Sequence, residues 1–470
     1  MAGDNMLQKL LCPEIRELIA AQDQETLRET LDRWLPADVA SLFSELSDEE
    51  DLAGFRLLRG PQRVQVFEYL ERPVQRELLS RLSPAEAGGL LNDMAADDRT
   101  ALLARMEDET RSNYFKLLDD EQRAVTQSLL QYPEGTVGRL MSPDYVAVRA
   151  HWTIQHVLEH IRRHGHDSET LNVVYVVDTD HHLIDDLRIR QVLLADPLHT
   201  IQTLMDENFV ALSANDPKRS AVEVFRRYDR TALPVIDGDG KLLGVVTIDD
   251  VLDVAVQAGT QDFQKFGGLE ALSDPYIATP LLTMVQKRAT WLVVLFLGEL
   301  LTATAMGYFE KEIAKAVVLA LFVPLIISSG GNSGSQAATL IVRALAIGEI
   351  QLRDWARVFS RELFSGCLLG VVLGTIGFLR IGIWKGLANA GWMSDLYGPH
   401  WFLVAVTVGV SLVGIVLWGT LSGAMLPFVL KRAGLDPATS SAPFVATLVD
   451  VTGLIIYFSV AMVVLHGTLL

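Results

Sequence analysis

Cysteine is almost absent from this sequence, which has two among 470 residues. Cys12 lies near the N-terminus and Cys367 lies within an apolar run. No disulfide framework and no cysteine-based metal site is therefore expected. The first residues are polar and charged, so they lack the apolar segment of a cleavable signal peptide. The part that follows them is expected to stay in the cytosol.

Positive charge is also scarce in the first part of the chain. Residues 1–274 hold 28 of the 40 Lys and Arg residues but 49 of the 58 Asp and Glu residues, a net charge of −21, whereas the remainder carries +3. Such acidity would repel phosphates, so it argues against nucleic-acid binding and favours cations as partners. The simpler alternative is a negative surface that only keeps this part in solution.

Long apolar runs are confined to the second part. They cover roughly residues 291–309, 316–329, 363–384, 401–421 and 443–465. Four approach the ~20 residues that span a bilayer, and the second does so as a long or broken helix once the following segment is added. Eight Lys and Arg residues on one side of these spans against four on the other predict a cytoplasmic N-terminus and an outside C-terminus.

Polar residues inside these runs are costly in hydrocarbon and so point to function. Asp450 and Glu299 each lie in the middle of a predicted span. The segment GGNSGSQ, residues 330–336, predicts irregular backbone at membrane depth, which is tolerated where protein or water covers it. Asn332 and Gln336 share one face if the segment is helical. Neutral oxygens with a strong carboxylate suit a hard cation.

Purely structural interpretations of these residues, without a role in ion binding, stay open. The glycines could serve only helix packing, and an intramembrane acid could be a protonated, hydrogen-bonded structural residue. A phosphate-binding loop is disfavoured, because no Lys-Ser/Thr pair follows GGNSGS.

Two internal repeats organise the first part. Residues 1–137 show helical periodicity, and 35–43 resembles 82–90, each with a proline at a helix start followed by an acid. Residues 138–255 repeat at an offset of 64, with LMSPDYVAV aligned to LMDENFVAL. Each copy predicts a β-α-β-β-α order, which resembles a tandem pair of CBS domains.

In CBS domains a Gly-x-x-Thr-x-x-Asp segment can hold a nucleotide. The second copy matches it through Gly244, Thr247 and Asp250, whereas the first copy reads DDLRIRQ over residues 185–191. The resemblance implies a possible site for ATP or another adenine nucleotide at the second copy, through Thr247 and Asp250. Alternatively, these two residues only cap the following helix.

Histidines recur every four residues at His156, His160 and His164, followed by His166. This spacing could bind a transition metal, although a solvated histidine face is the more ordinary explanation. Residues 249–268 predict an amphipathic helix that ends at a glycine pair. Residues 274–292 then lead into the first span and are expected to lie along the membrane surface.

In this order the parts resemble the MgtE family of magnesium channels and transporters over essentially the whole chain. The specific segments are GGNSGSQAATLIVRALA, GAMLPFVLKRAGLDPA and APFVATLVDVTGLIIYF. The implied fold is a multidomain membrane protein. It has an all-α superhelical N-domain (1–137), α/β CBS domains (138–200 and 201–255), a connecting amphipathic helix (256–287) and a five-helix transmembrane pore domain (288–470).

The resemblance implies a homodimer in the plasma (inner) membrane, with a pore for Mg²⁺ on the twofold axis and no obligate protein partner. Asp450 would supply the pore carboxylate. Further pore residues are expected at Ala446, Thr447, Asn332, Gly331 and Glu299. A pore that keeps the hydrated ion avoids the cost of dehydrating Mg²⁺.

Regulation by cytosolic Mg²⁺ is expected to follow from the acidity, because bridged carboxylates would favour one state. The candidate regulatory residues are Asp93, Asp97, Asp98, Asp229, Asp249, Asp250, Asp253, Asp262 and Asp436. One departure stands out: the connecting helix has Gln257, Ala258 and Gln261 where relatives often carry acids. Gating by Mg²⁺ is thus expected to be blunted or centred elsewhere.

Three other functions stay open. One is a secondary transporter of another divalent ion, or an exchanger coupled to protons or Na⁺ through Glu299. Another is a nucleotide-sensing protein whose spans serve only as an anchor, which the intramembrane acids argue against. An enzyme is least expected, since no nucleophile and base occur in a plausible context.

Overall fold

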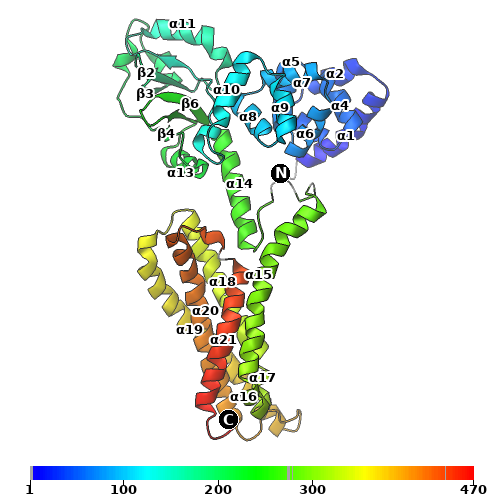
Figure 1. Cartoon of the computed structure of the whole chain (residues 1–470), viewed down its shortest axis with the longest axis vertical. Coiled ribbons are helices and arrows are strands. Elements are labelled where there is room, and N and C mark those ends of the chain that lie inside the picture. The colour runs from blue at the N-terminus through cyan, green and yellow to red at the C-terminus, as the bar shows by residue number, and fades with distance from the viewer. Residues whose placement is uncertain (1–3, 273–275, 278, 440, 470) are drawn as a thin grey trace. The chain divides into compact units, whose positions relative to one another are not determined.

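The computed structural model describes residues 4–272, 276–277, 279–439 and 441–469. The chain divides into two compact units, Met1–Ala258 and Gly259–Leu470, which we call unit 1 and unit 2. Figure 1 traces both units from the blue N-terminus to the red C-terminus.

Unit 1 begins with ten helices, as the periodicity predicts. They are α1 (Asp4–Ala20), α2 (Gln24–Asp32), α3 (Pro36–Phe43), α4 (Asp48–Leu57), α5 (Gly60–Tyr69), α6 (Arg72–Arg81), α7 (Pro84–Asp93), α8 (Ala96–Ala104), α9 (Asp108–Phe115) and α10 (Asp120–Leu130). The apolar faces of α1 to α9 meet in one core that includes Phe43, Phe67 and Leu91, whereas Leu129 of α10 packs with the second CBS copy. The helical N-terminal region is thereby confirmed.

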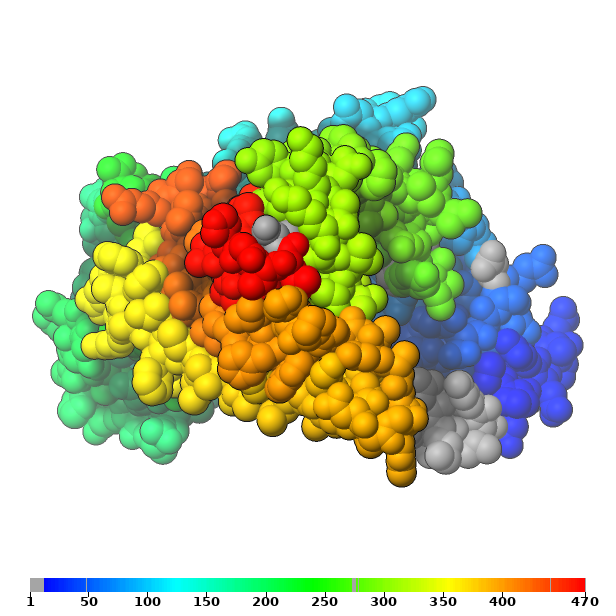
Figure 2. All heavy atoms as spheres, turned by 90° about the horizontal axis from the view of Figure 1, so that it is seen from below, coloured from blue at the N-terminus to red at the C-terminus, as the bar shows by residue number. Residues whose placement is uncertain are grey.

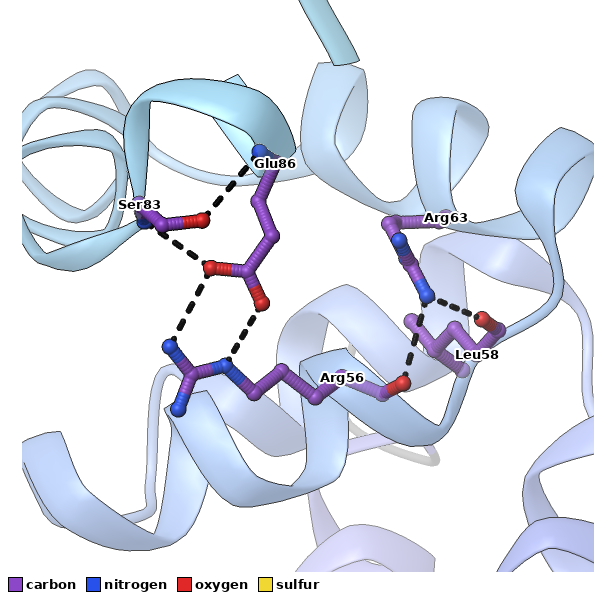
Figure 3. Close-up of polar contacts among 5 residues, drawn as sticks. All are labelled: Arg56, Leu58, Arg63, Ser83 and Glu86. Atoms are coloured by element: carbon purple, nitrogen blue, oxygen red, sulfur yellow. Dashed lines mark hydrogen bonds and ion pairs between the residues drawn. The ribbon is translucent and has the colours of Figure 1, made fainter. Parts of the chain in front are cut away.

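The proline-and-acid helix starts are confirmed in α3 and α7. Pro84 opens α7, and Ser83 and Glu86 form a reciprocal capping box at its start. Glu86 also accepts a hydrogen bond of 2.9 Å from Arg56 of α4, as Figure 3 shows. The Arg56 guanidinium and the Ser83 amide together lower the pKa of Glu86 to about 2. One acid therefore both starts a helix and links it to an earlier one.

The two CBS copies follow with the predicted order. The first contains β1 (Ala147–Val148), α11 (Ile154–His164), β2 (Val173–Val177), β3 (Leu183–Arg188) and α12 (Ile189–Leu194); the second contains β4 (Leu212–Ser213), α13 (Lys218–Tyr228), β5 (Ala232–Ile236), β6 (Leu242–Thr247) and α14 (Ile248–Phe266). Short 3-10 turns precede each copy at Val137–Arg139 and Ile201–Thr203, and another follows α11 at Gly165–Asp167.

Each copy builds a three-stranded sheet with one parallel and one antiparallel pair. The orders are β1-β2-β3 and β4-β5-β6. The two β-hairpins also meet, because Leu183 donates its amide to Gly240 at 3.0 Å and Leu242 donates to His181 at 2.9 Å. The tandem CBS fold predicted from the repeat is therefore confirmed, and α14 ends just before Gly267 as predicted.

Unit 2 contains the apolar helices. They are α15 (Leu281–Tyr308), α16 (Glu310–Lys315), α17 (Val317–Ala320), α18 (Val323–Ala346), α19 (Trp355–Asn389), α20 (Trp401–Arg432) and α21 (Ala442–Val464), with 3-10 turns at Leu352–Asp354 and Pro437–Thr439. Among the described residues, five helices are long and apolar enough to span a membrane, as predicted. The first begins at Leu281, ten residues before the predicted start, so the chain enters it as a helix. Part of the predicted surface segment, at 274–275 and 278, lies outside the described residues.

The expectation of irregular backbone at GGNSGSQ is wrong. Residues 323–346 form one continuous helix through all three glycines, and the interruption lies earlier, around Ala316 and between α17 and α18. The glycines instead let helices touch: a methyl group on Gly423 of α20 would collide with the carbonyl of Gly334. Small residues allow such backbone contact in membrane helices.

The end of unit 2 that carries the C-terminus is closed by packing. Figure 2 shows the red C-terminal residues beside the light-green chain near α16 and the orange residues near 400. Phe309, Leu319, Tyr397 and Leu465 belong to one buried core here. Tyr457 of α21 donates its hydroxyl to the Leu319 carbonyl at 2.9 Å.

Candidate functional site

Asp450 lies on α21 directly opposite Gly331 of α18. A methyl group on Gly331 would lie 3.6 Å from Asp450 Oδ1 and 3.4 Å from the Cβ of Ala446. The missing side chain therefore leaves room beside the carboxylate. Asp450 is half-buried within unit 2. The structure thus brings together three of the predicted pore residues on two adjacent helices.

A polar stripe runs along the exposed face of α18. Ser328, Asn332, Gln336 and Thr339 are all exposed in the single chain, and Asn332 Nδ2 donates to Ser328 Oγ at 3.3 Å. The opposite, buried face holds Ser333, whose hydroxyl pairs with Thr420 of α20 at 2.7 Å. The helical spacing predicted the shared face of Asn332 and Gln336, and the structure shows that this face has no cover within unit 2.

Thr447 and Glu299 connect the same region to α15. A methyl group on Gly298 would lie 2.9 Å from Thr447 Cγ2, so α15 and α21 approach closely one turn from Asp450. Thr447 donates its hydroxyl to the Pro443 carbonyl at 3.1 Å. Glu299, next to Gly298, is exposed, and its charge acts on Asp450. All six predicted pore residues therefore lie on α15, α18 and α21.

A group of carboxylates gathers within unit 1, and we call it the acidic cluster. Its members act on one another electrostatically and are Glu68, Asp97, Asp98, Glu169, Asp249, Asp250 and Asp253. They come from α5, α8, the segment after α11 and the first turns of α14. Five of the nine predicted regulatory residues are thus brought together.

Burial and like charge disfavour ionisation in the acidic cluster. Burial first, and then the charges of Asp250 and Asp98, hold the pKa of Asp97 well above its usual range. Burial raises the pKa of Asp250 to about 7 against an opposing hydrogen bond from Thr247, and the Asp249 charge adds to the rise. Burial and then the Asp98 charge also raise the pKa of Glu68 to about 7. Near neutral pH the cluster therefore favours either protons or a cation.

One atom of the acidic cluster lacks a partner. Asp97 is 6% exposed, and its Oδ1 is buried with no hydrogen-bond partner among the described residues. A buried carboxylate oxygen without a hydrogen bond raises the free energy of the folded state, so a water molecule or a hydrated ion that donates a hydrogen bond to it would stabilise that state. In the described part of the chain, three candidate ligand atoms lie within 4.8 Å of one another only at Asp178, Asp180 and His182. The acidic cluster is thus too open to wrap a bare ion.

The other four predicted regulatory acids lie elsewhere. Asp93 ends α7 and is exposed. Asp229 ends α13 in the left-handed region, with φ of 47°. Asp262 and Asp436 belong to unit 2, where Asp436 pairs with Lys265 at 2.6 Å.

The predicted nucleotide residues are side by side in the second CBS copy. Thr247 ends β6 and donates its hydroxyl to Asp250 Oδ2 at 2.8 Å, which also agrees with the simpler capping role. In the first copy Asp185 stands where Gly244 stands in the second. Its carboxylate accepts the amides of Asp206 and Glu207 at 2.9 and 3.1 Å. The first copy therefore fills with its own side chain a place that glycine keeps small in the second.

The histidine series forms a row of ring contacts along α11. Trp152, just before the helix, lies edge-to-face with His156 at 4.6 Å and with His160 at 5.1 Å between ring centroids, and the tilted rings of His160 and His164 lie 4.4 Å apart. Because the histidines follow one another along the helix rather than converge on a point, the solvated face is the better explanation.

Glu68 and Glu169 belong to the acidic cluster, but sequence reasoning missed them. They lie on separate elements and carry no motif, and no local spacing relates them to Asp97 or Asp250. Only the packing of the helical region with residues of both CBS copies brings them together.

Models of three known families match successive parts of the chain. A model described as "divalent cation transporter" (MgtE) matches residues 323–460. The model "MgtE intracellular N domain" matches 34–135, and the CBS domain model matches 137–196 and 201–257.

Individual relatives extend this match. The chain is similar to the magnesium transporter MgtE of Thermus thermophilus, with 38% identity over 98% of this chain and 100% of the relative. It is similar to the Bacillus subtilis transporter of the same name, with 27% identity over the same shares. A crystal structure of the cytosolic domain of the Mg²⁺ channel MgtE in complex with ATP matches 52% of this chain and 100% of that chain, at 34% identity and a TM-score of 0.50.

Proposed function

The chain belongs to the MgtE family of magnesium transporters, and we propose that it conducts Mg²⁺ into the cytosol along α18 and α21. The observation that carries this proposal is the pairing of Asp450 with Gly331, which leaves space beside a carboxylate in the apolar unit. A charged residue at membrane depth is expensive and marks ion pathways. Asn332, next to Gly331, adds an amide oxygen on the exposed face of α18.

The hydrated ion is the better substrate for this site. Mg²⁺ dehydrates reluctantly and prefers carboxylates with several waters retained. Asp450, Asn332 and Thr447 offer oxygens that suit hydrogen bonding to those waters. A divalent ion gains about 4–5 kcal/mol per 100 mV of membrane potential, from roughly 2.3 per unit charge. The electrochemical gradient therefore suffices as the driving force.

A homodimer would complete the path. The polar stripe of Ser328, Asn332, Gln336 and Thr339 cannot face lipid without cost, and a second copy would cover it and add a second Asp450. In unit 1, Leu193 and Leu252 are 61% and 58% exposed at equivalent positions of α12 and α14, which supports a paired CBS module. In a protein without Cys12 and Cys367, Asn332→Cys should form a disulfide-linked dimer in membranes.

The direct test of the path is Mg²⁺ influx into vesicles reconstituted with the full chain. Asp450→Asn keeps the shape of the side chain but removes its charge, so influx should fall about a hundredfold, a loss of roughly 2.7 kcal/mol. Glu362→Gln on α19 is the matched control, because it removes another acid from an apolar helix. Equal influx in wild type and Asp450→Asn would refute the proposal.

Gating by cytosolic Mg²⁺ is supported by the acidic cluster. Its carboxylates repel one another when bare, and a cation would stabilise the packed state, shifting the population toward it. The acid-poor stretch at Gln257, Ala258 and Gln261 supports a blunted response. Influx measured against rising internal Mg²⁺ should decline over a wide range, and an abrupt cutoff would contradict the blunting.

An adenine nucleotide at the second CBS copy is supported by the ATP complex of the relative's cytosolic domain and by the paired Thr247 and Asp250. ATP binding measured by calorimetry should weaken in Thr247→Val. The alternative of a coupled exchanger rests on Glu299, whose charge acts on Asp450. A current that reverses at the Mg²⁺ equilibrium potential in both wild type and Glu299→Gln would exclude that alternative.

We propose the plasma (inner) membrane as the location, with the C-terminus outside. The N-terminal part is cytosolic, and five spans place the two ends on opposite sides. The excess of Lys and Arg at the cytosolic ends of the spans supports this orientation.

A further inference from the structure

The last turn of α14 is joined to the loop between α20 and α21 by an ion pair inside unit 2. Lys265 Nζ lies 2.6 Å from Asp436 Oδ2, across 171 residues of sequence. The two side chains are 34% and 37% exposed, so the contact is partly shielded from water. It links the end of the connecting helix to the segment that leads into the helix of Asp450.

Asp436 is oriented by its own loop. Its Oδ1 accepts the amide of Ala438 at 3.0 Å, and its carbonyl accepts the Thr439 hydroxyl at 2.6 Å. The 3-10 turn Pro437–Thr439 therefore fixes one carboxylate oxygen and leaves the other directed at Lys265. A fixed carboxylate holds a partner more firmly than a mobile one, because less side-chain freedom is lost.

A second contact fixes the same joint. Gly268 has φ of +75° and follows the end of α14, and a methyl group there would lie 2.7 Å from the Trp291 ring. Trp291 in turn donates its indole N–H to Ser441 Oγ at 3.1 Å. Ser441 is fully buried and is the N-cap residue of α21, where it accepts the Phe444 amide at 3.3 Å. The end of α14 and the residues after it thus make two contacts here, one with the loop before the Asp450 helix and one with the N-cap of that helix.

We propose that Lys265 is a tethered cation that neutralises Asp436 and so holds the end of α14 to the loop that leads into the Asp450 helix. This inference rests on the proposed function. An ammonium is a compact point charge on a flexible stem and can satisfy one carboxylate oxygen. Because it is covalently attached, its occupancy does not depend on the Mg²⁺ concentration.

Two separate interactions then stabilise the closed state of the ion path. The acidic cluster of unit 1 responds to Mg²⁺, whereas the Lys265–Asp436 contact is present at any Mg²⁺ concentration. The acid-poor composition of the connecting helix then has a physical reason: this joint carries its own positive charge. Loss of the contact should raise influx at low internal Mg²⁺ and leave the metal-dependent part in place.

The experiment uses the full chain in vesicles, with Mg²⁺ influx measured against internal Mg²⁺. In Lys265→Gln, influx at low internal Mg²⁺ should rise about two- to fivefold, the range expected for loss of one partly exposed ion pair. In Lys265→Glu, two carboxylates face each other, so closure at this joint should now need a cation. The same low-Mg²⁺ rise should therefore be followed by a steeper decline than in wild type as internal Mg²⁺ increases.

Two controls separate this role from general effects of charge or folding. Lys431→Glu makes the same charge change at the exposed end of α20 and should leave the curve unchanged. Exchange of the pair, Lys265→Asp with Asp436→Lys, should restore the wild-type curve, which a purely structural role of either residue would not predict. If Lys265→Glu does not fold, Lys265→Gln and the exchanged pair still decide the question.

Identical curves for wild type and Lys265→Gln would overturn the tethered cation, as would identical curves for Lys265→Gln and Lys265→Glu. Failure of this inference leaves the loss of influx in Asp450→Asn intact. If Asp450→Asn instead conducts as wild type does, the proposed ion path itself is refuted, and the two failures are thereby distinguishable.

Discussion

Asp450 and the acidic cluster hold carboxylates under opposite conditions. Around Asp450, glycines bring α18 and α21 together and leave space beside one acid. In unit 1, seven acids from four segments crowd together, and burial raises the pKa of several of them. The site around Asp450 has space for an ion but few carboxylates. The acidic cluster has many carboxylates but few groups that offset their negative charge.

This difference matches the two tasks proposed for these places, ion conduction and ion sensing. An ion path must release its ion, so it needs few ligands and retained water. A sensor must discriminate between ion concentrations, so binding has to relieve a cost that is present in the free state. The unpartnered Asp97 Oδ1 is such a cost. The two regions can be tested separately, at the glycines of unit 2 (the glycine side) and at the acidic cluster of unit 1 (the acid side).

The largest effect is expected from adding a side chain where Gly334 of α18 touches Gly423 of α20, a contact that we call the glycine seam. In Gly423→Ala the new methyl group would collide with the Gly334 carbonyl, and backbone cannot move aside as a side chain can. The free energy of unfolding should fall by about 3 kcal/mol or more, at the upper end for overpacking. Gly386→Ala on α19 is the control, because nothing lies within 4 Å of its added methyl group. Equal melting temperatures in detergent for the two variants would contradict the seam.

The acid side should respond in the opposite sense. Asp97→Asn removes a buried, incompletely hydrogen-bonded charge, so without metal the free energy of unfolding should rise by about 1–3 kcal/mol. The stabilisation that Mg²⁺ gives to wild type should shrink in this variant. Asp93→Asn, which changes an exposed acid four residues earlier, is the matched control. The sensor role of Asp97 is wrong if Mg²⁺ stabilises Asp97→Asn as strongly as wild type.

The sequence contained most of the fold, because periodicity and repeats are local signals. The helical region follows from helical periodicity and the five spans follow from apolar runs, whereas the two CBS copies follow from an internal repeat and a resemblance to a known family. Irregular backbone is predicted for the GGNSGSQ segment because glycine lowers helix propensity in isolation, but the segment is helical. In the structure the close contacts of Gly334 and its neighbours with α20 outweigh that preference, which spacing within one segment cannot reveal.

The candidate site was predictable only in part, for a related reason. An acid inside an apolar run is conspicuous, so Asp450 and Glu299 stand out without any structure. Glu68 and Glu169 are ordinary surface-type residues in sequence, and their role depends on tertiary packing. The Lys265–Asp436 pair likewise joins residues whose separation hides their contact.

An intermediate effect is expected at Gly331, the glycine that lies beside Asp450. In Gly331→Ala the added methyl group makes only ordinary contact with Ala446, at 3.4 Å, so the fold should persist. The same methyl group occupies space 3.6 Å from Asp450 Oδ1 that a hydrated ion would need. Mg²⁺ influx should drop about tenfold, equal to roughly 1.4 kcal/mol. Gly386→Ala should conduct normally, and an unchanged influx in Gly331→Ala would move the path away from this face of Asp450.

The smallest effect is a pH dependence confined to the acid side. Asp250 and Glu68 have pKa values raised to about 7, whereas the unfolded chain titrates near 4. The folded unit therefore binds more protons than the unfolded chain between pH 4 and 7, so its stability falls as pH rises through that window and levels off above it. Without metal, the free energy of unfolding of unit 1, followed by hydrogen exchange in the full chain, should fall by about 1 kcal/mol per pH unit between pH 5 and 6.5. This is less than the roughly 2.7 kcal/mol that two fully shifted groups would give, because both carboxyl groups are partly exposed and solvent screens them. Saturating Mg²⁺ should flatten this slope, because a bound cation favours the ionised carboxylates in the folded state. An equal slope with and without Mg²⁺ would mean that the cluster senses protons but not the metal.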